Sequence, residues 1–86
     1  MPEVSRFLGI VIRMYYNEHP PPHFHVQYNE YMAELSIETL EIIEGHLPRR
    51  ILSIVLEWAA LHRDELRQNW QRARRHEIIM AIEPLV

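Results

Sequence analysis

The chain of 86 residues lacks cysteine and lysine altogether, and aspartate occurs only once. Without cysteine, neither a disulfide bond nor a thiolate metal site can form. No apolar run approaches the roughly 18 residues of a membrane-spanning helix, and the first residues do not resemble a signal peptide. We therefore expect a soluble protein of the cytoplasm that has no membrane partner.

Length and composition bound the architecture. Domains usually contain about 100–150 residues, so the chain suffices for one small domain over residues 1–86. Its 48% hydrophobic and 24% charged residues are typical of a globular protein. A chain of this size buries only about 60–65% of its unfolded surface, so its core is thin. A homodimer interface would be a natural supplement to that core.

Charge is distributed unevenly along the chain. Residues 1–45 carry seven glutamates and two arginines, a net charge of −5. Residues 46–86 carry seven arginines and five acidic residues, a net charge of +2. Nucleic-acid-binding proteins usually show a stronger basic excess. The distribution therefore favours another protein as the partner over a nucleic acid.

Alternating hydrophobicity predicts four antiparallel strands, at residues 6–16, 23–28, 31–37 and 40–45. Leu40 and Ile42 continue the core face on the last strand, which Gly45 ends. A two-residue turn at Asn29-Glu30 would set the register between the second and third strands. It would pair Val26 with Ala33, Phe24 with Leu35, His25 with Glu34, and His23 with Ser36.

Residues 49–74 follow Pro48, contain no glycine or proline, and are rich in good helix formers, so they predict one long helix. One stripe at helical spacing consists of Leu52, Val55, Ala59, His62, Leu66, Trp70 and Ala73, and Ile51, Ile54, Trp58 and Leu61 widen it. Residues 78–82 predict a short fifth strand or an apolar tail. The predicted fold class is α+β: a four-stranded antiparallel meander with one long helix packed on one face.

A combination of short motifs spans nearly the whole chain. They are Tyr16-Asn17-Glu18-His19, Pro21-Pro22-His23-Phe24-His25, Leu47-Pro48, Glu57-Trp58, Asn69-Trp70 and Ile82-Glu83-Pro84-Leu85. The combination resembles a family of small bacterial proteins of unassigned function with a PPHFH signature. Members of that family are often encoded beside a second small domain, as in toxin–antitoxin pairs. The resemblance therefore implies a small partner protein encoded nearby, and it implies no activity and no catalytic residue.

Three of the six histidines lie within seven residues, interrupted by three prolines. His23 and His25 alternate on one strand, so their side chains leave the same face about 6.5–7 Å apart. The predicted register adds the carboxylate of Glu34, and His19 joins them if the proline loop folds back. Two imidazoles and a carboxylate suit a divalent metal such as Zn²⁺ or Fe²⁺, with positions left open for water.

A plainer interpretation accounts for the same cluster, and we favour it. The histidines are then exposed or dimer-facing side chains on the polar face of the sheet, and the prolines stiffen a loop. A divalent metal is the one cofactor that the pattern suggests, and no cofactor is certain.

Arginines at both ends of the predicted helix are candidates for contact with anions. Arg49 and Arg50 lie at the positive end of the helix dipole, where a phosphate would bind. We favour ion pairs with Glu41 or Glu44 at that position.

Further along the helix, Arg63, Arg67 and Arg74 share a face near Trp70, a combination that can bind RNA. We favour a solvated face there, because Asp64 and Glu65 dilute the positive charge.

The sequence leaves three functions open. The first, which we favour, is a small intracellular regulatory or interaction protein, one component of a toxin–antitoxin-like two-gene module. The second is a metal-dependent phosphodiesterase or ribonuclease that uses His23, His25 and Glu34. The third is a nucleic-acid-binding protein that uses the helix arginines. No nucleophile with a base and an oxyanion donor can be named, so whether the chain is an enzyme stays open.

Overall fold

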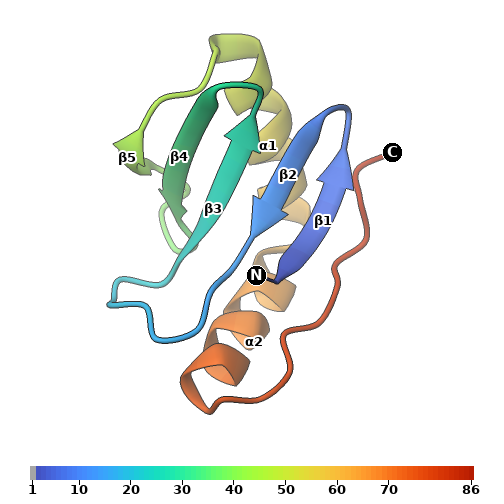
Figure 1. The fold of residues 1–86 in the computed structure, drawn as a ribbon. Coiled ribbons are helices and arrows are strands. Elements are labelled where there is room, and N and C mark those ends of the chain that lie inside the picture. The colour runs from blue at the N-terminus through green and yellow to red at the C-terminus, as the bar shows by residue number, and fades with distance from the viewer. Residues whose placement is uncertain (1) are drawn as a thin grey trace.

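A computed structural model describes residues 2–86 as a five-stranded antiparallel sheet with two helices on one face (Figure 1). Sheet order follows chain order, with the strands β1 (Glu3–Phe7), β2 (Ile10–Arg13), β3 (His23–Tyr28), β4 (Tyr31–Ser36) and β5 (Ile42–Gly45). The helices are α1 (Arg49–Leu61) and α2 (Arg63–Arg74). The predicted α+β class and the antiparallel meander are confirmed. Within residues 2–86, neither helix has the length and apolar character to cross a membrane.

The predicted strand over residues 6–16 is wrong, because the chain reverses in its middle. Leu8 and Gly9 form a turn with positive φ angles of 52° and 79°. Phe7 consequently pairs with Ile10, and β1 and β2 form a hairpin. The turn also changes which side chains are buried. Phe7 lies in the core, whereas Leu8 is 57% exposed. The sheet therefore has five strands rather than four, and the extra strand is N-terminal.

The predicted pairing of β3 with β4 is confirmed at every position. The turn lies at Asn29-Glu30, and Asn29 has the positive φ of 53° that such a turn requires. The pairs are Val26 with Ala33, Phe24 with Leu35, His25 with Glu34, and His23 with Ser36.

The last strand, β5, differs from expectation in its side chains. It ends at Gly45 as predicted, but Ile42 is 37% exposed and Ile43 is 46% exposed. The register shifts between Glu34 and Leu35, which leaves Ile43 without a direct partner on β4. Such a bulge redirects the side chains of a short outer strand. Leu40 is only half-buried, so the predicted core face does not continue across β5.

The predicted single helix is two helices, separated at His62. The φ of −118° and ψ of 23° at His62 are not helical, and its Nδ1 lies 2.5 Å from Oε1 of Glu65. No glycine or proline marks this break. The apolar stripe is nevertheless confirmed, except that Leu61 is 67% exposed. Its buried members are Ile51, Val55, Trp58, Ala59, Leu66, Trp70 and Ala73.

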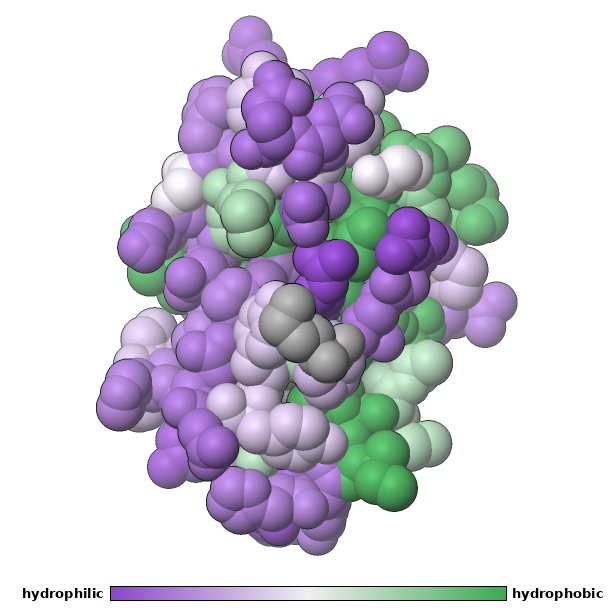
Figure 2. Space-filling model, viewed as in Figure 1, coloured by the Kyte–Doolittle hydropathy of each residue, from purple (hydrophilic) through white to green (hydrophobic). Residues whose placement is uncertain are grey.

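Residues 78–82 do not form a strand. The C-terminal segment instead runs along the outer side of β1, where the N–H of Ile82 donates to the carbonyl of Val4 at 2.7 Å. Ile82 is buried, whereas Ile78 and Met80 are exposed. Figure 2 shows apolar atoms along this side of the molecule and a mainly hydrophilic sheet face turned away from the helices.

Candidate metal centre

The loop between β2 and β3 brings a carboxylate over the start of β3. Asn17 has a positive φ of 61°, and Glu18 follows it. The end of the loop is fixed to the sheet, because the N–H of Ile37 donates to the carbonyl of Pro22 at 3.0 Å. His23, directly after the proline run, is therefore the first residue of β3, and the loop that carries Glu18 folds back toward β3.

Three side chains converge there, namely Glu18, His23 and His25, which we call the loop site. One potential ligand atom from each lies within 4.8 Å of the others. Oε1 of Glu18 is 3.4 Å from Nε2 of His23 and accepts a hydrogen bond from Nε2 of His25. Ligand atoms bound at 2.0–2.2 Å to a tetrahedral ion lie roughly 3.4 Å apart. The loop site thus has the ligand types and the compactness of a metal centre.

One hydrogen bond decides which ring nitrogen of His23 carries a hydrogen. Its Nδ1 lies 2.8 Å from the carbonyl oxygen of Pro21. A carbonyl oxygen can only accept, so Nδ1 carries a hydrogen, and in the neutral form of the ring Nε2 then carries the lone pair. Nε2 is buried and has no hydrogen-bond partner within residues 2–86. Its nearest acidic atoms are Oε1 of Glu18 at 3.4 Å and Oε1 of Glu34 at 3.6 Å.

This arrangement is electrostatically incomplete. A buried lone pair without a donor is costly, and here it faces carboxylate oxygens that are themselves acceptors. A cation between these atoms would satisfy the lone pair of His23 and would replace the hydrogen that His25 and Glu18 share. Histidines that bind metal commonly donate their other ring N–H to a carbonyl, as His23 does to Pro21.

Aromatic rings surround the two histidines. The ring of His23 lies 5.2 Å from that of Trp70 on α2 and 5.2 Å from that of His25. Tyr15 meets His25 edge-on at 4.6 Å. His23 is only 6% exposed. The interpretation of both histidines as exposed is therefore wrong for His23, because α2 extends to the start of β3 and covers it.

The predicted ligands occupy different places around the loop site. Glu34 pairs with His25 in the sheet and approaches His23, but it is not one of the three converging residues. His19 is exposed and lines a neighbouring cavity beside Glu18. Sequence reasoning missed Glu18 as a candidate ligand, although it directly precedes His19 in the quoted motif. The available signal was an acidic residue in the same loop as the histidines.

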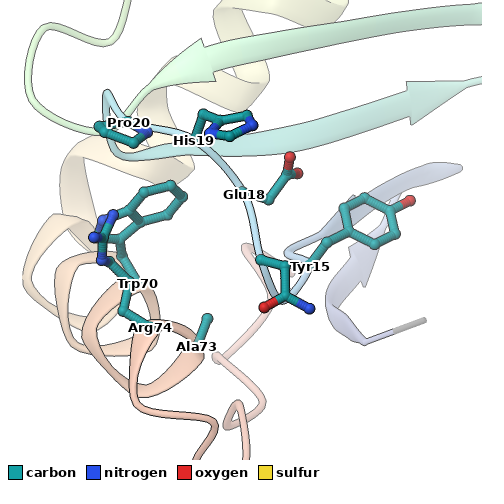
Figure 3. Close-up of a pocket in the computed structure, with 8 residues that line it drawn as sticks. Tyr15, Glu18, His19, Pro20, Trp70, Ala73 and Arg74 are labelled. Atoms are coloured by element: carbon teal, nitrogen blue, oxygen red, sulfur yellow. The ribbon is translucent and has the colours of Figure 1, made fainter.

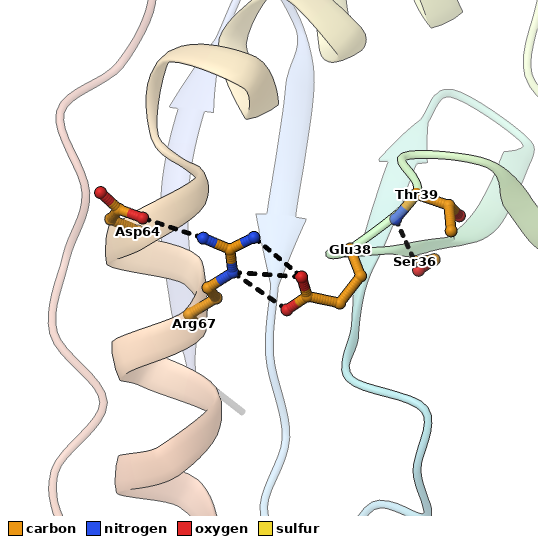
Figure 4. Close-up of polar contacts among 5 residues, drawn as sticks. All are labelled: Ser36, Glu38, Thr39, Asp64 and Arg67. Carbon is orange, nitrogen blue, oxygen red and sulfur yellow. Dashed lines mark hydrogen bonds and ion pairs between the residues drawn. The ribbon is translucent and has the colours of Figure 1, made fainter.

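The structure does not assemble the arginines of α2 into one free basic surface. Arg67 forms an ion pair with Glu38 at 2.8 Å and with Asp64 at 3.1 Å (Figure 4). The hydrogen bond between Arg67 and Glu38 raises the pKa of Arg67 and lowers the pKa of Glu38. Arg63 is half-buried, while Arg74 lines the same cavity as His19.

Arg49 and Arg50 are exposed at the start of α1. Among the residues that the structure describes, no ion pair joins them to Glu41 or Glu44. The favoured ion pairs at this position are therefore not formed. Both arginines lie outside the loop site.

The fold and the loop site define a small α+β protein with a two-histidine, one-carboxylate cluster. A family model described as Domain of unknown function (DUF4160) matches residues 9–71. The chain belongs to this family, which agrees with the expectation of a family without an assigned function. No curated protein and no solved structure matches the chain.

Proposed function

We propose that the chain is a metal-binding protein and that the loop site holds one divalent metal ion. The observation that supports this most directly is the buried Nε2 of His23, which has no donor and faces carboxylate oxygens. His25 and Glu18 supply the other two ligand atoms. Glu34 is near enough to His23 to accept a hydrogen bond from a water on the metal, or to become a further ligand after a small movement.

The donor set indicates the class of metal. Two imidazole nitrogens and a carboxylate oxygen suit Zn²⁺, Fe²⁺ or Mn²⁺ better than Ca²⁺ or Mg²⁺, which prefer oxygen ligands. With three protein ligands, at least one position stays open to water or another molecule. The proposed site is therefore of the kind that supports chemistry as well as structure.

Metal analysis of the full chain, purified without a His tag, tests this proposal. We expect one Zn²⁺, Fe²⁺ or Mn²⁺ per chain and a higher melting temperature with added metal. At 100 times Kd, the stabilisation should reach about 2.7 kcal/mol. Glu18→Gln and His25→Gln should weaken metal binding by more than about 100-fold, since even outer-shell changes cost 10–100-fold.

His46→Gln is the matched control, because His46 is exposed and packs against Tyr31 away from the loop site. It should leave metal affinity unchanged. Circular dichroism of each variant without metal separates loss of binding from loss of folding. Absence of stoichiometric metal together with an unchanged melting temperature would falsify the proposal.

A second candidate function is that of a cytoplasmic component of a bacterial toxin–antitoxin-like module, which binds the product of a neighbouring gene. The outer edge of β5 supports it, because among the described residues 2–86 this strand pairs only with β4, and it exposes Ile42 and Ile43. An unpaired edge with apolar side chains is a template for strand addition from a partner.

The charges beside this edge indicate the chemistry of the partner. Glu41 and Glu44 flank the two isoleucines and are exposed. In an antiparallel pairing of two copies of β5, these glutamates would approach one another and repel. A strand of another protein that alternates apolar residues with arginine or lysine complements the edge better.

Co-expression with the neighbouring gene product tests this second candidate. The two products should co-purify, and Ile43→Lys should abolish the complex without unfolding the chain. Lysine at position 43 removes the apolar contact and adds a positive charge that the proposed basic strand of the partner would repel. Leu61→Lys, at an exposed apolar position on α1, should leave the complex intact. A neighbour that folds and acts normally without this chain would contradict the idea.

A further inference from the structure

A cavity of about 310 Å³ adjoins the loop site, and we call it the loop pocket (Figure 3). The loop between β2 and β3 forms one wall through Tyr15, Glu18 and His19, and α2 forms the other through Trp70 and Arg74. Glu18 belongs to both the loop site and the loop pocket. A molecule in the loop pocket would therefore lie directly beside the proposed metal.

Arg74 supplies positive charge to the loop pocket. It is exposed and, within residues 2–86, forms no ion pair, whereas Arg67 on the same helix is engaged by Glu38. A guanidinium group donates two parallel N–H groups to a phosphate or carboxylate. Because no described side chain occupies these donors, they are available to an anionic ligand.

Glu18 makes the occupation of the loop pocket depend on metal. Without a cation, its carboxylate repels an anion in the pocket. A divalent ion bound to Glu18 reverses the sign of the local charge, so that metal and Arg74 attract the same anion from two directions. Divalent metals and arginine together are the usual pair that binds a phosphoryl group.

We propose that the loop pocket binds the phosphate group of a phosphodiester and that the chain hydrolyses it. This rests on the metal site proposed above. The oxygen of a water molecule adds to phosphorus, and the bond from phosphorus to the leaving oxygen breaks. One proton of the water passes to the leaving oxygen, and the other stays on the phosphate or passes to solvent. The products are a phosphate monoester and an alcohol.

In this reaction the chain positions the diester rather than bonding to it covalently. Arg74 holds the non-bridging oxygens and stabilises the charge that they gain as water adds. Trp70 fixes the wall of the loop pocket, because its ring is 5% exposed and packs on His23. A bound metal would polarise the phosphoryl oxygen that is nearest to Glu18.

Hydrolysis of bis(para-nitrophenyl) phosphate by the full chain tests the proposal, with Zn²⁺ or Mn²⁺ added. We expect hydrolysis only with metal, and inorganic phosphate should inhibit it competitively. Arg74→Ala should lower kcat/KM by about 100-fold, the usual effect of removing one charge-stabilising group. Arg74→Lys should restore part of the loss, and metal affinity should be unchanged in both variants.

Arg75→Ala is the control, because Arg75 is an exposed neighbour that does not line the loop pocket. It should retain full activity, while Glu18→Gln should lose both metal and hydrolysis. A chain that binds metal stoichiometrically but does not hydrolyse the diester overturns this proposal and leaves the metal site standing. Hydrolysis that is equal in the wild type and Arg74→Ala also overturns it. A chain that binds no metal removes both proposals.

Discussion

The two outer strands of the sheet, β1 and β5, differ in what lies beside them. The C-terminal segment covers β1, where the N–H of Ile82 donates to the carbonyl of Val4. Nothing in residues 2–86 covers β5 in this way, and Ile42 and Ile43 remain exposed. One edge is therefore covered by the chain itself, and the other exposes apolar side chains.

The C-terminal segment adds to the thin core on the side of β1. It contributes the buried side chain of Ile82 and the partly buried Ile79 and Leu85, and it also makes polar contacts with the helices. Asn69 binds both backbone groups of Met80, at 2.8 and 2.9 Å, and Nε1 of Trp58 donates to the carbonyl of Glu83 at 2.9 Å. Within residues 2–86, no equivalent segment lies along the outer edge of β5.

The largest difference in stability between the two edges should come from replacing a buried isoleucine at one edge and an exposed isoleucine at the other with alanine. Ile82→Ala should lower the free energy of unfolding by about 2–4 kcal/mol, because it empties a buried position. Ile43→Ala should cost less than about 1 kcal/mol, since its side chain is 46% exposed. Urea denaturation of both variants measures this. Equal losses would mean that β5 is also covered in solution.

Asn69→Ala tests the polar fastening of the covered edge. Asn69 is fully buried, and its amide is the partner of both backbone groups of Met80. Removing it should destabilise the protein by about 2–3 kcal/mol, because hydrogen bonds of a buried group are lost without replacement. Gln68→Ala, at an exposed neighbour on α2, should change stability by no more than about 0.5 kcal/mol. A small effect of Asn69→Ala would show that the other contacts of the segment, such as Ile82 in the core and the hydrogen bond from Trp58 to Glu83, suffice to hold it.

Two glycines allow a matched comparison near the two edges. Gly45 ends β5 with a φ of 87°, and a Cβ there would lie 2.2 Å from the carbonyl oxygen of Met32. Gly9, in the turn of β1 and β2, has a φ of 79°, and a Cβ there would make only an ordinary van der Waals contact with the Tyr28 ring at 3.5 Å. Gly9→Ala should cost about 1 kcal/mol from backbone strain alone. Gly45→Ala should cost about 1–3 kcal/mol, because strain and the steric clash add.

Thermal unfolding of both glycine variants measures the difference. If Gly45→Ala lowers the melting temperature no more than Gly9→Ala does, the pairing of β5 with β4 contributes little to the stability of the fold. That result would describe the open edge as loosely attached as well as uncovered.

The smallest effect should come from the ion pair of Glu38 and Arg67, which ties α2 to the turn between β4 and β5. Arg67 lowers the pKa of Glu38 below its ordinary value of 4.5. The pair therefore stabilises the fold fully above that value, and its contribution is lost as pH falls through the lowered pKa. Unfolding of the wild type and Glu38→Gln should differ slightly at neutral pH and converge in acid. An undiminished difference in acid would exclude this pair as its cause.

Several elements were predictable because their signals are local. The register of β3 and β4 follows from alternation of side chains and from the length of the turn at Asn29-Glu30. The buried stripe of the helices follows from helical spacing. Neither pattern depends on how distant segments meet, and both are confirmed.

Other elements depend on contacts that local patterns do not encode. The turn at Leu8-Gly9 had one glycine as its signal, within a run of apolar residues that suited a single strand equally well. The break at His62 has no helix-breaking residue, and its local partner is the side chain of Glu65. The C-terminal segment is not a strand: one backbone bond, from Ile82 to Val4, joins it to β1, and side chains of Asn69 and Trp58 join it to the helices.

The candidate site divides in the same way. The sequence by itself determined that His23 and His25 share one face of a strand, because side chains alternate along it. Only the tertiary structure decided that Glu18 is the carboxylate that joins them and that Trp70 buries His23. The path of the loop that carries Glu18, and the position of α2 over β3, depend on how segments distant in the sequence pack together. The spacing of residues does not specify either of them.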